Sequence, residues 1–552
     1  MTSSNKYEDN LEKNLANYTE LTPLSFLERT ARVFPDHTAV IHGSIRRNWL
    51  ETYKRCIKLA SSLSNLGIGK GDTVAMMLPN VPAALEAHFG VPMCGAVLNA
   101  LNIRLDAKTI AFILDHGESK VLLTDKEFSN TVKEALNLCK SKPIVIDVQD
   151  SLAPEGELLG ETEYESFLES GDEDFGWQYP KDEWDAISLN YTSGTTGNPK
   201  GVVYHHRGAA LNSIGNITSW GMQHQPRYLW TLPMFHCNGW CFTWATTAVG
   251  ATNICLRRVD PLEVYRLIDK ESVTHMCCAP TVLTSMYSIP DADQQDLTGV
   301  TIMTAGAPPA PQVIRSMENM GADILHTYGL TETYGPTAIC AIQPDWKEKS
   351  SDEVANLKAR QGVAYVVADT GMRVVDTEMN DVERNGSQMG EVVMSGNMVM
   401  SGYFDDEDAT NKAFEGGWFH SGDLAVWHPD GYIELKDRAK DIIISGGENI
   451  SSQEVEKVIM EHDGVLEVSV VGVPDERWGE VPKAFIVSRE GVSVSEEEIV
   501  SFTRDRIAHF KAPKYVEFGE LPKTATGKIQ KYVLREKEWE GKENRIQGSS
   551  LT

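Results

Sequence analysis

The stretch YTSGTTGNPKG, residues 191–201, combines three glycines, four Ser or Thr hydroxyls and one lysine. Glycines let backbone N–H groups approach an anion closely, hydroxyls add donors, and Lys200 adds a mobile positive charge. The alternating AISLN before it indicates a strand that delivers the turn. The order differs from GxxxxGK[ST], because Pro199 precedes the lysine and Gly201 follows it. An ordinary surface loop is the alternative, but the ordered pattern favours a phosphate-binding loop.

A second stretch, LPMFHCNGWCFTW at residues 232–244, gathers aromatic side chains around one histidine. Trp240 follows His236 by four positions, so both would face one cavity if the segment is helical. An indole in that cavity would reduce its volume and favour a small ligand. The alternative is a buried packing cluster, and some of the aromatic residues must serve that purpose.

A layered framework must position these groups. From residue 73 to residue 330, short β-branched runs alternate with helical patterns, which predicts an α/β fold with largely parallel sheets. The acid-rich segment 155–185 is predicted to be a solvated connection. The predicted strands are 73–80, 121–125, 143–148, 227–235, 273–280, 300–306 and 323–329, and the predicted helices are 82–98, 128–140 and 311–320.

The sequence pattern changes twice further along the chain. Between residues 365 and 432, MRVVDTEM, GEVVMSG and GYIEL are separated by Asn/Gly and Asp/Gly turns, which predicts an antiparallel β segment. After KDRAKD, alternating helix and strand patterns predict a compact α+β unit. We therefore expect two domains, residues 1–436 and residues 437–552, which also suits a chain too long for one core.

Composition restricts the partners and the compartment. The formal net charge of −28 argues against nucleic-acid and anionic-membrane partners, because both would be repelled. Nine cysteines without zinc-ligand spacing indicate buried free thiols, as at Cys277 and Cys278, and a reducing cytoplasm. The start lacks a signal-peptide pattern, the end SSLT is not a peroxisomal SKL signal, and no apolar run reaches membrane-spanning length.

The loop is followed by LPMFHCNGW, TAGAPP, TYGLTE, GWFHSGDLAVWHPDGYIELKDRAKDIIISGGENIS and LPKTATGKIQK. This ordered series resembles the acyl-adenylate-forming enzymes, from about residue 24 to residue 537. The resemblance implies a large N-terminal domain, a small mobile C-terminal domain and a reaction in two halves. A carboxylate attacks the α-phosphate of ATP to give acyl-adenylate and pyrophosphate, and CoA thiolate then displaces AMP.

The resemblance assigns the adenylation roles. Lys528 would reach between the carboxylate and the α-phosphate, although a lysine in this setting is otherwise a solvated surface residue. Glu332 would bind Mg²⁺ with Thr192, the alternative being an acid at a helix start. Tyr328 would lie against adenine, and Asp423 would accept hydrogen bonds from the ribose. The implied ATP-site residues are Thr192, Ser193, Gly194, Thr195, Thr196, Gly197, Lys200, Gly306, Ala307, Pro308, Thr327, Tyr328, Gly329, Thr331, Asp423, Arg438 and Lys528.

The resemblance also assigns the thioester half. Asp437 matches the hinge about which the small domain swings, so that Lys528 leaves and a second face arrives. A glycine turn on that face would let the pantetheine approach the backbone. Trp478 joins this group, with an exposed surface aromatic as the alternative. The implied CoA-side residues are Lys440, Ser445, Gly446, Gly447 and Trp478.

The acyl pocket is implied to hold His236 as a catalytic gate and orienting group, with Trp240 and Gly306 beside it. The segments LSFLERTARVFP and HFGVPMCGAVLNALNIRLDA are similar to bacterial 3-methylmercaptopropionyl-CoA ligases. A thioether against an indole gains only about 0.3–1.5 kcal/mol. Short-chain, medium-chain and branched acids therefore stay as alternatives to 3-methylmercaptopropionate.

Two other classes of function stay open. An adenylating enzyme could pass its acyl group to a carrier-protein thiol, although no carrier domain follows Lys537. A non-catalytic nucleotide sensor would be expected to have lost Lys528 or Glu332, and both are present. The expected reactants are ATP, Mg²⁺, CoA and a small carboxylate, and a homodimer is one open oligomeric state.

Overall fold

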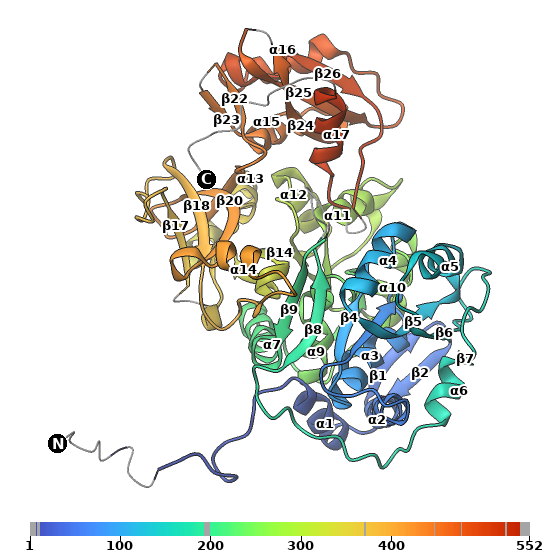
Figure 1. The fold of residues 1–552 in the computed structure, drawn as a ribbon. Coiled ribbons are helices and arrows are strands. Elements are labelled where there is room, and N and C mark those ends of the chain that lie inside the picture. The colour runs from blue at the N-terminus through green and yellow to red at the C-terminus, as the bar shows by residue number, and fades with distance from the viewer. Residues whose placement is uncertain are drawn as a thin grey trace, which may run out of the picture.

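A computed structural model describes Tyr7 and residues 11–192, 199–368, 371–446, 448–475, 477–524 and 527–540. Figure 1 shows a large N-terminal domain with a smaller C-terminal domain above it. The described residues form four sheets, three in the large domain and one in the small domain. This arrangement confirms the predicted α/β class.

The first large sheet carries the strand that leads into the predicted phosphate loop. Its central strands pair in parallel, as the alternating pattern predicted. In spatial order the strands are β19 (Gly402–Tyr403), β9 (Gly201–His205), β8 (Ala186–Tyr191), β4 (Val97–Ala100), β3 (Thr73–Met77), β5 (Ser119–Asp125), β6 (Ile144–Val148) and β7 (Thr162–Glu163).

The second large sheet carries the predicted adenine and magnesium residues. Six of its strands run in parallel as a block, and antiparallel strands extend it at both edges. In spatial order the strands are β16 (Val363–Ala364), β15 (Gly335–Ile339), β14 (Asp323–Leu330), β13 (Thr301–Thr304), β12 (His275–Cys278), β10 (Arg227–Trp230), β11 (Thr252–Cys255), β1 (Thr38–His42) and β2 (Ile45–Asn48).

Helices cover these sheets, and one of them is buried on every side. The helices of the large domain are α1 (Leu24–Val33), α2 (Trp49–Asn65), α3 (Pro82–Met93), α4 (Ala107–His116), α5 (Ser129–Leu138), α6 (Tyr164–Glu169), α7 (His206–Trp220), α8 (Cys237–Trp240), α9 (Phe242–Ala248), α10 (Pro261–Glu271), α11 (Pro280–Tyr287), α12 (Pro311–Asn319), α13 (Ser351–Lys358) and α14 (Glu407–Ala413). Every residue of α3 is buried; most are apolar, and the Glu86 carboxylate is paired with Arg55 at 2.7 Å. A Cβ at Gly90 would lie 2.7 Å from Leu59 Cδ2, so glycine lets α2 and α3 approach closely.

Two predicted segments need correction. The helix predicted over residues 82–98 ends at Met93, because Gly95 has a φ of 88° and the apolar residues after it form β4. The solvated connection predicted over 155–185 contains β7 and α6. Tyr164 and Phe167 of α6 are buried, so its apolar face packs into the main core. The high acid content concealed those few apolar positions.

The remaining two sheets confirm the β segment and the α+β unit. The four-stranded antiparallel sheet joins β17 (Met372–Val375), β18 (Met389–Met394), β20 (Phe419–Trp427) and β21 (Ile433–Arg438). The small domain contains β22 (Ile443–Ser445), β23 (Glu448–Ile450), β24 (Val465–Asp475), β25 (Gly479–Ser488) and β26 (Tyr515–Phe518), with α15 (Ser452–Ile459), α16 (Glu496–Arg504) and α17 (Lys531–Trp539). Asp437 lies within β21, and the boundary predicted there stays a prediction.

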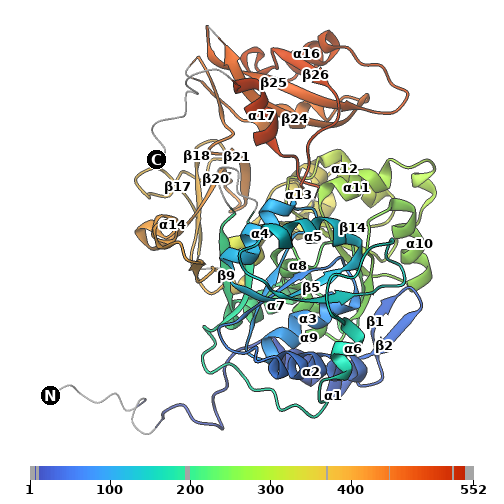
Figure 2. The same ribbon diagram turned by 45° about the vertical axis from the view of Figure 1, so that its right-hand side comes forward.

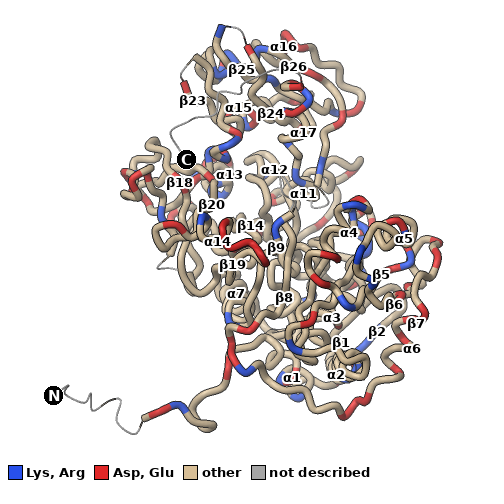
Figure 3. Tube along the Cα trace, viewed as in Figure 1, with Lys and Arg blue, Asp and Glu red and all other residues tan. Residues whose placement is uncertain are grey.

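The structure also shows the state of the cysteines, the distribution of charge and the character of the helices. All nine cysteines are free, and eight are buried, as predicted for unpaired thiols. Acidic and basic positions are interspersed over both domains (Figure 3). Among the helices described, none combines the length and apolar character needed to cross a bilayer.

Candidate active site

The base of the predicted phosphate loop lies between β8 and β9. Tyr191 and Gly201 are paired across these antiparallel strands. The Thr192 N–H donates to the Lys200 carbonyl at 2.9 Å, which closes the loop at its base. Lys200 points its ammonium at the ring of Tyr403, with 4.7 Å to the centroid. The central loop residues lie outside the described part of the chain: Ser193, Gly194, Thr195, Thr196 and Gly197.

Glu332 lies in a single 3-10 turn, η3 (Thr331–Thr333), after β14. Tyr403 donates its hydroxyl hydrogen to Glu332 Oε1 at 2.8 Å. The backbone N–H of Met400 donates to the Glu332 carbonyl at 2.8 Å. Burial raises the pKa of the Glu332 carboxyl above its usual value. A nearby cation would oppose that shift, because it stabilises the charged form.

A magnesium ion fits this setting. Mg²⁺ takes few protein ligands, keeps several waters and bridges to phosphates. Within the described ranges no group of three His, Cys, Asp or Glu side chains could hold a metal by itself. Glu332 is therefore a single carboxylate at the end of a strand, which suits a metal shared with a bound phosphate.

Sequence reasoning missed Tyr403, which touches both predicted phosphate-side groups. Its hydroxyl binds Glu332, and its ring faces the Lys200 ammonium. Tyr403 forms part of β19, which pairs with β9 directly after the phosphate loop. No residue spacing could have found it, because β19 is far from β9 in the chain.

The predicted ribose and adenine residues meet across two sheets. The Tyr328 hydroxyl donates to Asp423 Oδ2 at 2.8 Å. Arg438 Nε lies 3.1 Å from Asp423 Oδ1, and the two residues are direct partners on β20 and β21. Tyr328 and Asp423 are both buried. The carboxylate is thereby fixed between a phenol and a guanidinium from separate elements.

The two predicted glycines near Tyr328 have different surroundings: Gly306 faces open space, and Gly329 is packed against another strand. Gly306 has a φ of 91°, and open space lies where its Cβ would be, so a ligand could approach its backbone. Ala307 is partly exposed and Pro308 is exposed in the same turn. At Gly329, by contrast, a Cβ would lie 1.8 Å from the Gly335 carbonyl oxygen, so this glycine serves strand packing. The buried Thr327 hydroxyl donates to the Thr304 carbonyl at 3.4 Å.

Lys528 comes to this cluster from the small domain. Figures 1 and 2 show the chain before α17 descending from the small domain towards α11. Gly527 has a φ of 83°, and a Cβ there would lie 2.2 Å from Thr281 Oγ1 of α11. Glycine is therefore required where the loop meets the large domain. A second contact joins the same helix, where Arg489 Nη2 donates to the Tyr287 hydroxyl at 2.6 Å.

Electrostatics place Lys528 beside the predicted site residues. The positive charge of Arg438, followed by desolvation from the surrounding protein, lowers the pKa of Lys528 to about 8 although part of the residue stays exposed, while Asp423 acts in the opposite direction. The Lys528 charge in turn acts on His236, although burial is the main reason that the pKa of His236 falls to about 4. Lys528, Arg438, Asp423 and His236 therefore share one electrostatic environment, with the lysine side chain still open to solvent.

The backbone after His236 is left-handed. Cys237, Asn238, Gly239, Trp240 and Cys241 have φ values of 48°, 45°, 59°, 53° and 62°. Left-handed backbone costs non-glycine residues roughly 1–2 kcal/mol each, so the surrounding structure must hold this turn. The shared facing of His236 and Trp240 was conditional on an ordinary helix, which these residues do not form, so a common cavity stays a prediction.

The aromatic residues around this turn are mainly core. Phe235, Phe242 and Trp244 are buried, which confirms the packing alternative for them. Trp240 is only 4 % exposed and lies against Gly335 of β15, where a Cβ would be 3.0 Å from Trp240 Cα. His236 remains partly exposed one turn away. Trp240 is thus part of the buried core, and its backbone N–H donates to the His236 carbonyl at 3.2 Å.

Asp437, the predicted hinge residue, is tied to the first helix of the small domain. Its Oδ2 accepts hydrogen bonds from Ser452 N at 2.7 Å and from Ser452 Oγ at 2.6 Å. Burial raises the pKa of Asp437, and the positive charge of Lys531 opposes that shift. The carboxylate thus joins β21 to the start of α15, next to the predicted domain boundary.

The predicted CoA-side residues separate into two places. Gly446 packs under the indole of Trp478, where a Cβ would lie 2.7 Å from Trp478 Cε3. Ser445 pairs with Gly479, the residue after Trp478. Lys440 instead belongs with the nucleotide-side charges, because burial and the charge of Arg438 lower its pKa. Gly447 lies outside the described residues.

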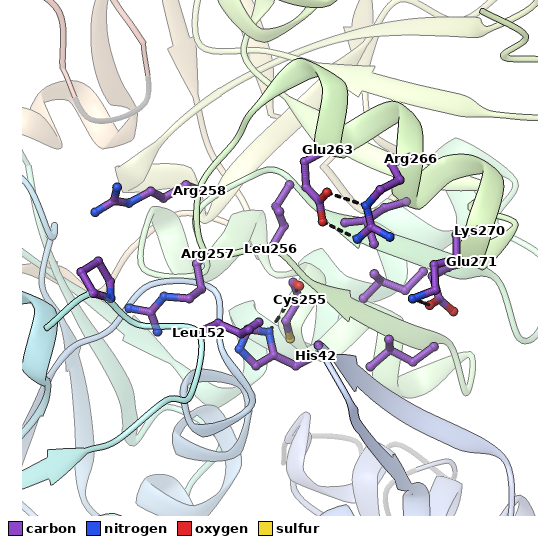
Figure 4. A pocket seen from close by; sticks show the side chains of 15 residues that line it. His42, Leu152, Cys255, Leu256, Arg257, Arg258, Glu263, Arg266, Lys270 and Glu271 are labelled. Carbon is purple, nitrogen blue, oxygen red and sulfur yellow. Dashed lines mark hydrogen bonds and ion pairs between the residues drawn. The ribbon is translucent and has the colours of Figure 1, made fainter.

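A pocket of about 380 Å³ lies away from these residues, beside β11 and α10 (Figure 4). Its charged side chains are paired: Glu263 binds Arg266 at 2.6 Å, and Arg257 binds Asp150 at 2.6 Å. None of the predicted site residues lines it. Its volume alone does not make it the reaction site.

Two family models cover most of the chain. The model of the AMP-binding enzyme matches residues 27–404, and that of the AMP-binding enzyme C-terminal domain matches residues 454–528. The chain belongs to the AMP-binding enzyme family. It is an ATP-dependent, AMP-forming acyl-CoA ligase, and ATP and CoA are its substrates.

Relatives of this family member are similar over nearly their full length. An acetate–CoA ligase of Humulus lupulus is 52% identical, and a peroxisomal acetate/butyrate–CoA ligase of Arabidopsis thaliana is 51% identical. In both comparisons, 96% of each chain is covered. The crystal structure of the anthranilate CoA ligase AuaEII with anthranoyl-AMP has a TM-score of 0.85 at 23% identity, covering 96% of this chain and 99% of that chain. This last likeness shows the fold.

Proposed function

We propose that the acid substrate is a short aliphatic carboxylate in the range of acetate to butyrate. The observation that carries this proposal is the buried Trp240, which packs against Gly335 and is bonded through its backbone N–H to the His236 carbonyl; an indole beside the proposed acyl pocket would leave little depth for an acyl chain. Relatives named for acetate and for acetate and butyrate support the same range. They favour these acids over the 3-methylmercaptopropionate predicted from the sequence, whose longer chain would extend towards the indole.

The first half-reaction would use Lys528 as the cation at the reacting centre. Nucleotidyl transfer depends on neutralising negative charge and aligning the reactants. With a pKa of about 8, Lys528 is mostly protonated at pH 7. Its ammonium could then contact both the carboxylate and the α-phosphate, while Lys200 binds the phosphate tail at the other end.

Asp423 and Arg438 would orient the nucleoside during this step. The paired geometry of their side chains keeps one carboxylate oxygen towards Tyr328 and one towards the guanidinium. Ribose hydroxyls could bind this carboxylate, and adenine could lie between Tyr328 and the Gly306 turn. Bound Mg²⁺, held by Glu332 and Thr192, would supply further charge neutralisation at the phosphates.

The second half-reaction would require the small domain to turn about Asp437. Two contacts support this proposal: Gly527, the residue before Lys528, lies against Thr281 of the large domain, and Gly446 packs against Trp478. A rotation would remove the lysine after adenylation and bring the glycine turn to the acyl-adenylate. His236, uncharged because of its low pKa, would then face the incoming thiol without adding positive charge.

An acid panel tests the proposed substrate range. Acid-dependent ATP–pyrophosphate exchange and CoA-dependent AMP formation would be measured with acetate, butyrate, isobutyrate, hexanoate and 3-methylmercaptopropionate. We expect kcat/KM to be highest for an acid of two to four carbons. Best turnover with hexanoate or 3-methylmercaptopropionate would contradict the proposed range, and a product formed only on a carrier-protein thiol would favour that rival acceptor.

A further inference from the structure

The left-handed turn from Cys237 to Cys241 is held by a buried asparagine of α7. Asn216 has no solvent exposure. Its Nδ2 donates to the Trp240 carbonyl at 2.8 Å and to Asn212 Oδ1 at 2.9 Å. Its Oδ1 accepts from the Tyr365 hydroxyl at 3.0 Å. Both amide hydrogens and the amide oxygen are therefore used, which fixes the direction of the side chain.

Asn212 extends the same hydrogen-bond network from α7 to β15. It lies one helical turn before Asn216 on α7 and is also fully buried. Its Nδ2 donates to the Pro336 carbonyl at 2.9 Å and approaches the Thr333 carbonyl at 3.4 Å. Pro336 follows Gly335, the residue against which Trp240 packs. Two asparagines thus set the spacing between the turn and β15.

The other flank of the turn is anchored to β8. Asn238 Oδ1 accepts from Ser188 Oγ at 2.6 Å and from Asn190 Nδ2 at 2.7 Å. All three side chains are buried. The turn is thereby clamped between β8 and α7.

We propose that Asn212 and Asn216 are positioning residues that set the depth of the acyl pocket by holding Trp240 against Gly335. A left-handed turn has unfavourable backbone angles and would relax if its carbonyl partners were removed. Apolar packing could fill the same space without fixing the turn, whereas an amide donor specifies where the Trp240 carbonyl must lie. This inference rests on the proposed preference for short acids.

The test compares acid selectivity in Asn216→Leu, which keeps a similar volume, and in the milder Tyr365→Phe, which removes the hydroxyl that orients Asn216. The measured quantity is the ratio of kcat/KM for hexanoate to kcat/KM for acetate. We expect this ratio to rise about tenfold in Asn216→Leu and about threefold in Tyr365→Phe, because one or two methylenes of pocket depth discriminate on that scale. Most of the change should come from a lower KM for hexanoate.

Thr30→Val is the matched control. It removes another buried hydrogen bond of the large domain, from Thr30 Oγ1 to the Thr247 carbonyl at 2.8 Å, and should leave the ratio unchanged. Equal losses for both acids in Asn216→Leu would show a merely structural role and overturn the inference. If Asn216→Leu does not fold, the ratio in Tyr365→Phe decides alone, and an unchanged ratio there overturns the inference.

Trp240→Gly separates this inference from the proposed function. Glycine suits the positive φ at this position, so the turn should survive while the pocket deepens. A higher hexanoate ratio in Trp240→Gly with no change in the Asn216 and Tyr365 variants would refute only the positioning role. No change in Trp240→Gly would overturn the inference, because the indole would then not limit the pocket depth. Only the absence of a preference for short acids in the unmodified enzyme would refute the proposed substrate range itself.

Discussion

At the nucleotide end of the site, charged and hydroxylated side chains from separate strands converge: Asp423 binds both Tyr328 and Arg438, and Lys528 arrives from the other domain. At the proposed acyl end, buried uncharged amides hold a strained backbone turn that carries the indole of Trp240. The charged side chains can stabilise a bound nucleotide over several ångströms, whereas the turn and its indole can affect a ligand only by contact and shape. Loss of a charge should therefore abolish chemistry, while loss of an amide should alter the choice of acid.

The largest effect is expected for Lys528→Ala. Removal of the only cation proposed to contact both reacting groups should lower acid-dependent ATP–pyrophosphate exchange about a thousandfold or more, consistent with losses of a key electrostatic group. Circular dichroism and thermal unfolding should stay unchanged, because the side chain is exposed.

Lys523→Ala is the matched control for that variant. Lys523 precedes the same loop and forms a surface ion pair with Glu467 at 2.6 Å, so its loss should change exchange little. Exchange in Lys528→Ala at the level of the control would remove Lys528 from the proposed mechanism.

The second prediction separates the two half-reactions. Asp437→Pro should restrict the backbone at the domain junction and slow CoA-dependent thioester formation about a hundredfold, while pyrophosphate exchange falls only severalfold. Single-turnover assays of each half-reaction provide the measurement. Asp437→Ala also loses the Ser452 contacts but keeps backbone freedom, so it controls for the capping interaction. Equal slowing of both half-reactions by proline would contradict a hinge at this residue.

The third prediction concerns pH. The pKa of Lys528 is lowered to about 8, and the protonated form is the proposed active form. The exchange rate should therefore be constant well below pH 8 and fall about tenfold per pH unit above it. Lys528→Arg stays protonated and should lose this alkaline limb, whatever its absolute rate. A limb of the same position in the arginine variant would assign the titration to another group.

The smallest effect is expected for Tyr403→Phe. Loss of the hydroxyl that binds Glu332 should leave the carboxylate less well placed and raise the Mg²⁺ concentration needed for half-maximal exchange about three- to tenfold. The ring that faces Lys200 is retained, so the KM for the acid should not change. Tyr179→Phe, which removes a surface hydroxyl bonded to Glu28, is the control. An unchanged Mg²⁺ requirement would show that Tyr403 does not support the metal site.

Sequence reasoning was most accurate where local patterns carry the information. The parallel strands from Thr73 to Asp125, the antiparallel β segment and the small α+β unit were predicted because apolar periodicity reports which face of an element is buried. The helix over 82–98 was too long, since one glycine and a strand followed without a change of hydrophobicity. The helix α6 was not predicted because its few buried apolar residues lie within a segment rich in acidic residues.

In the candidate site, too, residues within sequence motifs were predicted, whereas their three-dimensional surroundings were not. Ordered sequence motifs named Lys528, Glu332, Asp423 and Tyr328, and the structure brings the ribose-side residues and the lysine together. Burial and the charge of Arg438 lower the pKa of Lys440, whereas Gly446 packs against Trp478, and the sequence motif indicated neither environment. Their roles in catalysis and CoA binding stay predictions.

The sequence by itself determined the fold class, the family and the order of the nucleotide-side residues, because those are written in local periodicity and in motifs that keep their order. Only the tertiary structure decided that Tyr403 contacts Glu332, and that Asn212 and Asn216 hold the turn carrying Trp240. Such contacts join segments remote in the chain. They depend on backbone angles and amide directions, which no short window of residues specifies.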